Sequence, residues 1–168
     1  PGCALLEPIP LRATEPPPIV PDRVDLSRKD GLVYMVDVQR GQGLAGVPAG
    51  AVKALRLFSY TYGYRNMGGL YGTVGMDGPW DVRRVLGTVP VNADGSALFR
   101  VPANVPIAVQ PLDSEGKALQ IMRSWTVAMP GERLACVGCH ESQNMTSPMK
   151  RAAAMHREPS ALKPFYGP

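Results

Sequence analysis

Short apolar or alternating stretches, separated by turn residues, recur along this chain, and that pattern is typical of β-strands. The first stretch, residues 32–38, is bounded by Gly31 and Gly41. A longer stretch, residues 52–64, carries four aromatic side chains spaced two positions apart, which predicts that they share one face of a strand. These side chains are Phe58, Tyr60, Tyr62 and Tyr64.

Four further strands are predicted downstream, at residues 85–91, 97–101, 107–112 and 118–127. Residues 92–95 read Asn-Ala-Asp-Gly, which is a strong signal for a tight hairpin between the first two. Residues 114–116 read Ser-Glu-Gly and predict a second hairpin between the last two. About six strands with turns at short spacing predict an all-β fold, an antiparallel β-sandwich over residues 23–134.

The two ends of the chain depart from this pattern. Residues 1–22 contain seven prolines, which favours an extended interdomain linker. In the C-terminal segment, 135–168, Ser147 and Pro148 are typical of a helix N-terminus and predict a short helix over residues 149–157. The chain shows neither a signal peptide nor a transmembrane stretch. It begins with Pro1 and not Met, and it ends on turn-like residues 165–168, so we interpret it as an excerpt from a longer protein.

Composition narrows the class of protein further. A chain of 168 residues is long enough for one sizeable core, and its 18 Gly and 18 Pro disfavour a bundle of long helices. The net charge of +4 comes without a run of basic residues, so no nucleic-acid surface is predicted.

The most informative motif is Cys136-Val137-Gly138-Cys139-His140, which gathers two of three Cys and one of two His into five residues. Two thiols at this spacing can add to the two vinyl groups of a haem, and the adjacent His then binds the iron from the proximal side. The motif therefore predicts one covalently attached haem c, with His140 as proximal ligand.

Three other interpretations of the motif stay open. Cys136 and Cys139 could be half of a zinc site, with His140 or Cys3 added, although the chain has no second Cys pair. They could also be a redox dithiol, which normally opens a helix after a strand. The third alternative is a buried structural pair.

The sixth iron ligand is less defined than the proximal one. Met145, Met149, Met155 and His156 all follow the motif, and Met67 lies in a Gly-rich loop. A Met or His ligand would make a six-coordinate electron carrier, whereas an open position would allow ligand chemistry. The aromatic strand face that ends at Tyr64 could pack against a haem edge. Together with two of the candidate methionines, this gives Met67, Tyr64 and Met145 as possible haem-pocket contacts.

A series of short motifs resembles one known family. They are Val-Pro-Ala-Gly at 47–50, Val-Lys-Ala-Leu-Arg at 52–56, Met-Gly-Gly-Leu-Tyr-Gly at 67–72, Gly-Met-Asp-Gly-Pro-Trp-Asp at 75–81, Val-Pro-Val at 89–91, Asp-Gly-Ser-Ala at 94–97, Val-Pro-Ala at 101–103, Gln-Pro-Leu-Asp at 110–113, Met-Arg-Ser-Trp at 122–125, Pro-Gly-Glu at 130–132 and Cys-Val-Gly-Cys-His-Glu at 136–141. Together they resemble the middle domain of the hydrazine synthase alpha subunit and its planctomycete-type relatives, over residues 20–168.

The resemblance implies a mostly β domain with one c-type haem, within an exported, periplasmic, multidomain protein. It also implies a redox partner protein or a neighbouring haem domain of the same chain, and an oligomer is possible. One position departs from the family pattern. In true synthases a Tyr four residues after the motif His ligates the iron, and the motif His binds a zinc ion instead. In this chain the position of that Tyr is Asn144.

Two classes of function follow from these observations. The first is electron transfer through a covalently bound haem with ordinary His140 ligation. The second is redox catalysis on a small nitrogen or oxygen species at an open iron face, and Asn144 speaks against hydrazine synthesis itself. A zinc-binding structural domain is the remaining alternative, and whether the chain is an enzyme stays open.

Overall fold

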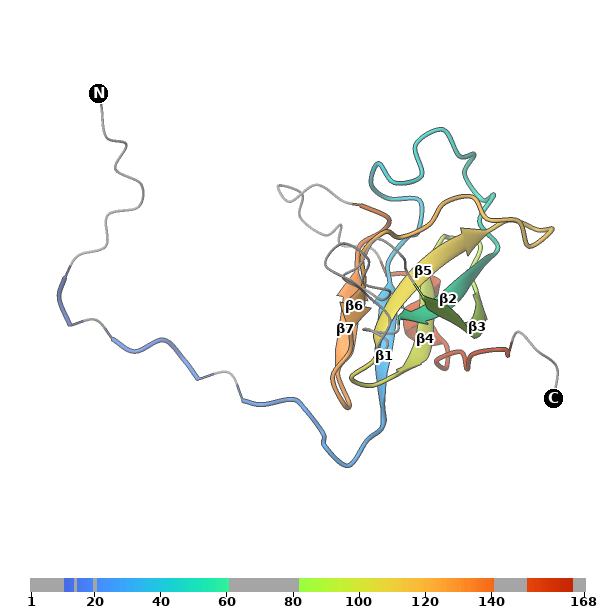
Figure 1. Cartoon of the computed structure of the whole chain (residues 1–168). Helices are drawn as coiled ribbons and strands as arrows, with labels where there is room; N and C mark the ends of the chain where they lie inside the picture. Colours follow the sequence, from blue (N-terminus) through green and yellow to red (C-terminus); the bar gives the residue numbers. More distant parts are fainter. Residues whose placement is uncertain (1–10, 14, 20, 61–81, 141–150, 165–168) are drawn as a thin grey trace, which may run out of the picture.

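Two β-sheets packed face to face form the body of the molecule (Figure 1). The computed structural model describes residues 11–13, 15–19, 21–60, 82–140 and 151–164. Within these residues there are seven strands and a single four-residue helix. The predicted all-β sandwich is therefore confirmed.

The first sheet has the strand order β4-β1-β7. Its strands are β1 (Asp30–Met35), β4 (Ala97–Pro102) and β7 (Arg133–Cys136). β1 pairs antiparallel with β4 but parallel with β7, so the sandwich is not antiparallel throughout. A parallel pair needs a long crossover connection, and here all strands of the second sheet lie between β1 and β7 in the sequence.

The second sheet has the strand order β3-β2-β5-β6, with every pair antiparallel. Its strands are β2 (Ala54–Tyr60), β3 (Arg83–Pro90), β5 (Pro106–Leu112) and β6 (Thr126–Val127). The register between β2 and β3 shifts between Leu57 and Phe58, which marks a β-bulge.

The core lies between the sheets and is built from alternate strand positions. Leu55, Leu57, Phe99 and Ile107 are each 0% exposed and belong to one hydrophobic cluster. Since successive side chains on a strand point to opposite faces, Phe58 and Tyr60 lie on the face of β2 that points away from this cluster. Tyr60 packs in a separate cluster with Ala108.

The turn at residues 92–95 forms, but its role differs from the prediction. Gly95 donates its backbone N–H to the carbonyl of Asn92 at 2.9 Å, and its φ of 83° lies in the region that favours glycine. β3 and β4 belong to different sheets, however, so the turn carries the chain across the sandwich instead of closing a hairpin ladder.

The strand predicted over 118–127 is wrong for most of its length, because only Thr126–Val127 forms a ladder with β5. Near its start there is a single bridge between Leu112 and Ala118. Between these points the Gln120 side chain accepts from the Ile121 N–H at 3.0 Å, which competes with strand pairing.

The helix predicted over 149–157 is shorter in its described part than predicted. Ala152 is extended, and only Ala153–His156 forms a turn of 3₁₀ helix, η1. The N–H of Ala153 donates to the Asp94 carboxylate at 2.8 Å, and that of Ala154 donates to the Ser96 hydroxyl at 3.0 Å. These long-range hydrogen bonds satisfy the first N–H groups of the turn and fix it against the first sheet.

The predicted linker over residues 1–22 is described only in part. Residues 11–13, 15–19 and 21–22 are exposed and contain neither helix nor strand. In the described part of the chain, no helix has the length and apolar character needed to cross a bilayer.

Candidate functional site

The Cys-x-x-Cys-His motif begins on a strand and not in a loop, which the sequence pattern did not predict. Cys136 is the last residue of β7 and pairs with Met35 of β1. Beyond the ladder, the N–H of Val36 donates to the Cys136 carbonyl at 2.9 Å, and that of Asp37 donates to the Val137 carbonyl at 3.1 Å. The first half of the motif is therefore held by the backbone that follows β1.

A second loop, residues 37–43, holds the other half of the motif. The N–H of Gly43 donates to the Cys139 carbonyl at 3.0 Å, and that of Gln42 donates to the His140 carbonyl at 3.2 Å. A Cβ at Gly41 would lie 2.6 Å from the carbonyl carbon of His140, and Gly41 has a φ of 90°. The loops approach so closely that only glycine fits at this position.

Gly138, inside the motif, is equally constrained. A Cβ there would lie 2.6 Å from the carbonyl oxygen of Asp37 and would collide with that of Arg40. His140 itself has a φ of 60°, in the left-handed region that a non-glycine residue seldom adopts. The backbone of the motif is thus held in a tight, defined curve.

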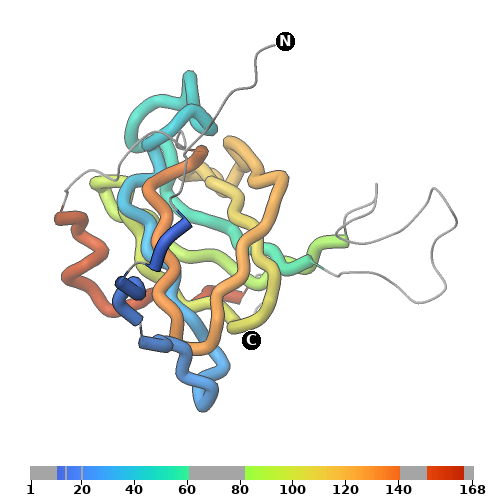
Figure 2. The backbone as a smooth tube through the Cα atoms, turned by 90° about the vertical axis from the view of Figure 1, so that its left-hand side faces the viewer, coloured from blue at the N-terminus to red at the C-terminus, as the bar shows by residue number. Residues whose placement is uncertain are grey.

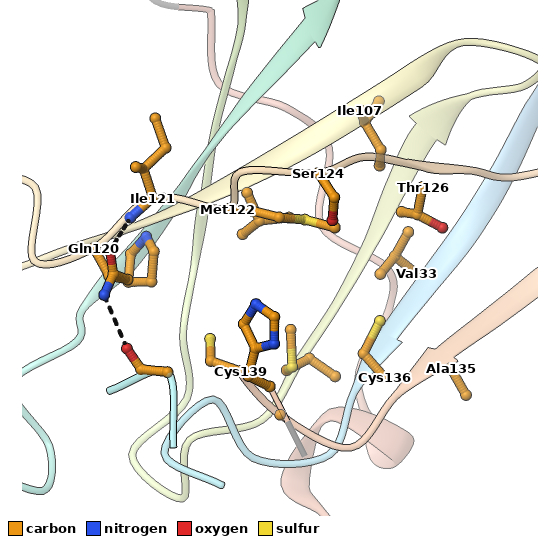
Figure 3. Close-up of a pocket in the computed structure, with 16 residues that line it drawn as sticks. Val33, Ile107, Gln120, Ile121, Met122, Ser124, Thr126, Ala135, Cys136 and Cys139 are labelled. Carbon is orange, nitrogen blue, oxygen red and sulfur yellow. Dashed lines mark hydrogen bonds between the residues drawn. The ribbon is translucent and has the colours of Figure 1, made fainter. Parts of the chain in front are cut away.

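The two thiols of the motif line a cavity of about 320 Å³ between the sheets. Figure 3 shows the sulfurs of Cys136 and Cys139 pointing from one wall toward the space below Met122 and Ser124. The complete lining is Val33, Met35, Gly43, Ile107, Val109, Pro111, Gln120, Ile121, Met122, Ser124, Thr126, Ala135, Cys136, Gly138, Cys139 and His140.

The opposite wall consists mainly of residues 120–126, the segment predicted as a strand. The Gln120 side-chain amide donates from Nε2 to the Gly43 carbonyl at 3.1 Å, which ties this wall to the loop that holds the motif (Figure 3). The N–H of Met122 donates to the Val109 carbonyl at 3.1 Å and ties the wall to β5. One wall therefore consists of the first sheet and the loop after β1, the other of the segment beside β5, and the two meet at Gln120.

The lining of the cavity suits the group that the motif predicts. Its volume is at the lower end of the range of about 300–1,000 Å³ typical of small-molecule and cofactor sites, so it would enclose part of the macrocycle. Of the described residues that line it, none is an Asp, Glu, Lys or Arg. An apolar space with two thiols on one wall and an imidazole beside them suits a flat, largely apolar macrocycle that is bound at its edge.

Several of the haem contacts predicted from the sequence cannot be placed against this cavity. Met67, Tyr62, Tyr64, Met145 and Met149 lie outside the described residues. Within the described residues, no group of three or more His, Cys, Asp or Glu gathers as a metal site would require, and zinc stays a prediction.

His156 and Met155 are described, and the structure places both in η1. η1 contacts β4, which is the edge of the first sheet opposite β7. Figure 2 shows the red C-terminal segment and the gold segment around residue 120 on opposite sides of the molecule. Neither side chain is among the residues that line the cavity, and both are exposed.

The aromatic strand face is partly described. The Tyr60 ring lies 6.2 Å from that of Trp125, and the Arg83 guanidinium lies 5.2 Å from the centre of the Tyr60 ring. Neither Phe58 nor Tyr60 lines the cavity. This face therefore lies outside the cavity, but Met122, which lines the cavity, also packs against Tyr60.

Sequence reasoning missed the apolar wall residues Val33, Met35, Ile107 and Met122, because each resembles an ordinary core residue. The one local signal was the density of glycines in residues 41–46, which mark the loop that approaches the motif.

Fold and site together define a class of protein: a small β-sandwich with a Cys-x-x-Cys-His loop at the edge of an apolar inter-sheet cavity. Residues 50–141 match the family described as the hydrazine synthase alpha subunit middle domain, and the chain belongs to this family. The resemblance noted from the short motifs is thereby confirmed.

A solved structure supports the fold assignment. The chain is similar to Kuenenia stuttgartiensis hydrazine synthase, with a TM-score of 0.64 and 21% sequence identity. The similarity covers 80% of this chain but 21% of that one, so this chain spans about a fifth of the solved chain. At this identity the likeness concerns the fold. No curated protein matches the chain.

Proposed function

We propose that this chain is a c-type haem-binding domain of an exported multidomain protein, and that it transfers electrons. One observation carries the proposal: both thiols of the motif line the same wall of an apolar cavity between the sheets. The predicted cofactor is one haem c, bound covalently by Cys136 and Cys139, with His140 as proximal iron ligand.

The attachment chemistry needs nothing beyond the two thiols and the two vinyl groups. Each S–H bond adds across one vinyl double bond, so that sulfur bonds to one carbon and hydrogen to the other. No atom leaves and no oxidant is consumed. The backbone around Gly138 is closely packed, and both sulfurs point into the same cavity, as two attachments to a single macrocycle require.

The cavity walls determine what such a site can do. When bound, haem c supplies a one-electron iron(III)/iron(II) couple. Val33, Met35 and Ile107 are buried apolar side chains that would exclude water from the macrocycle and lower the local dielectric. Both effects tune a reduction potential, and neither requires a substrate.

The proposed cofactor and the family together suggest where the protein is located and what its electron partner is. Because c-type haem is attached outside the cytoplasm, the proposal implies a periplasmic or otherwise exported protein. The family description names a middle domain of an enzyme subunit, which supports neighbouring domains in the same chain. A haem domain among them is the electron partner of this proposal. A separate redox protein is the alternative partner.

The test is to express the chain with a cytochrome c maturation system and record a pyridine haemochrome spectrum. We expect a covalent c-type spectrum from the native chain and none from the double variant Cys136→Ser with Cys139→Ser. Cys3→Ser is the matched control, since it removes the third thiol and leaves the motif intact. Zinc without iron in the purified chain would refute the proposal and support a structural zinc site instead.

A second candidate function is redox catalysis on a small nitrogen or oxygen species at an open iron face, and it is favoured by the family match alone. Asn144 stands where the synthase pattern has Tyr, so hydrazine synthesis is not proposed. Binding of CO or NO to the haem-loaded chain would favour this candidate, whereas a spectrum unchanged by either gas would favour electron transfer.

A further inference from the structure

Two thioether side chains line the cavity in the described part of the chain, Met35 and Met122, and neither was among the sequence-predicted iron ligands. Thioether sulfur is a soft ligand that binds haem iron in electron-transfer proteins and raises the reduction potential. The question is which of the two faces the motif from across the cavity.

Met35 does not face the motif from across the cavity. It pairs with Cys136 in the ladder between β1 and β7, and paired residues on neighbouring strands project from the same face of the sheet. Met35 is also 4% exposed and belongs to the core cluster. It is therefore part of the same wall as the two thiols.

Met122 comes from the opposite wall. Figure 3 shows it across the cavity from Cys136 and Cys139, whose sulfurs point into the cavity from the other wall. The proximal His140 is adjacent to Cys139 in the sequence, so a ligand on the far face of the macrocycle has to come from this second wall.

The position of Met122 is held from three directions. Its N–H donates to the Val109 carbonyl at 3.1 Å, and its side chain packs against Tyr60 and Ala108. Two residues earlier, Gln120 is tied to the Gly43 carbonyl at 3.1 Å. A ligand held in this way needs little reorganisation on binding or on electron transfer.

We propose that the Met122 sulfur is the sixth ligand of the haem iron, so that His140 and Met122 bind the iron from opposite walls of the cavity. This inference rests on the proposed function and deepens it. It predicts a six-coordinate, low-spin site of the electron-carrier type, in place of ligation by Met67, Met145, Met149 or His156.

The test compares the haem-loaded native chain with Met122→Leu and Met122→His. We expect the native ferric protein to show the weak near-infrared charge-transfer band of thioether–iron ligation, and Met122→Leu to lose it and bind added imidazole or CO. Met122→His should restore a low-spin spectrum without the band and lower the reduction potential. Met155→Leu is the matched control, since Met155 is 58% exposed on η1 and should leave every signal unchanged.

The outcomes separate the inference from the proposed function. A covalent haemochrome together with an unchanged near-infrared band in Met122→Leu would overturn the role of Met122 and leave haem attachment standing. A native band that is absent from the start would overturn it equally. If the native chain carries no covalent haem, the proposed function fails and this inference fails with it. Far-ultraviolet circular dichroism of Met122→Leu checks that the fold persists.

Discussion

Gly138 is the residue on which the shape of the motif depends most directly. Its substitution by Ala would bring a Cβ within 2.6 Å of the Asp37 carbonyl oxygen and into collision with that of Arg40. Both are backbone atoms and cannot rotate away, so the loops must separate. We expect Gly138→Ala to lower the free energy of unfolding by about 1–3 kcal/mol, as overpacking does, measured by urea denaturation.

A matched substitution separates this contact from general effects of replacing glycine. Gly116 has a φ of 78°, but no neighbouring atom lies within 4 Å of the position that a Cβ would take, so Gly116→Ala tests backbone conformation without a clash. Its expected cost is about 1–2 kcal/mol, the penalty of a left-handed residue. If Gly138→Ala retains full stability, the close approach of the two loops is not a constraint.

Asp30 is one place at which the stability of the molecule depends on pH. Its carboxylate accepts hydrogen bonds from Arg100 at 2.8 Å and from Arg28 at 3.0 Å, and these bonds hold the pKa of Asp30 below its usual value. A lowered folded-state pKa contributes stability above the unfolded pKa of about 4, and this contribution is lost as the pH falls through the lowered pKa.

The expected result is a pH-dependent difference between the native chain and Asp30→Asn. The variant should have a lower Tm near pH 7, and the difference should shrink steadily below about pH 4 as the native carboxylate is protonated. Glu115→Gln is the control, because Glu115 pairs with Lys117 at the exposed surface, where such pairs contribute little. A Tm difference that is constant from about pH 7 to about pH 2 would contradict the assignment.

At the scale of strands, what could be predicted depended on whether the signal was local. The strands near residues 32–38 and 107–112 were predicted because apolar runs between turn residues mark them. β7 was missed because its pairing with β1 joins residues about a hundred positions apart. The turn at residues 92–95 was recognised by its residues, but nothing local could show that β3 and β4 belong to different sheets.

Buried residues of the central strands contribute more to stability than exposed residues of the edge strands. Leu57 lies in β2, a central strand of the second sheet, and is 0% exposed. Leu57→Ala should cost about 2–5 kcal/mol of unfolding free energy, from lost burial and the cavity left behind. Val127→Ala in β6, where the side chain is 41% exposed, should change it by less than about 0.5 kcal/mol. Equal urea midpoints for the two variants would contradict this assignment of the core.

For the molecule as a whole, only part of the candidate site could be predicted from the sequence, as was the case for the fold. Cys136, Cys139 and His140 were predicted because the motif is contiguous in the sequence. The rest of the cavity lining was not, because Val33 and Met122 come from segments about ninety residues apart and meet only when the sheets pack. The candidate site therefore consists of a contiguous motif and of wall residues that only the packing of the sheets brings to it.

Since the cavity lies between the sheets, a covalently bound haem would contact both and act as a bridge. The haem-loaded chain should therefore unfold at a higher Tm than the double variant Cys136→Ser with Cys139→Ser. Each 1 kcal/mol of added stability should raise Tm by about 2–4 °C in a domain of this size. Calorimetry of the two proteins at one pH measures the difference.

Hydrogen exchange shows where that stability is gained. Contact with both walls predicts slower amide exchange in β1 and β7 on one side and in residues 120–126 on the other, compared with the double variant. The N–H of Met122 is the most direct reporter, because it bonds to the Val109 carbonyl on the wall opposite the thiols. If protection rises in residues 136–140 alone, the bound haem lies outside the sandwich and does not link the two sheets.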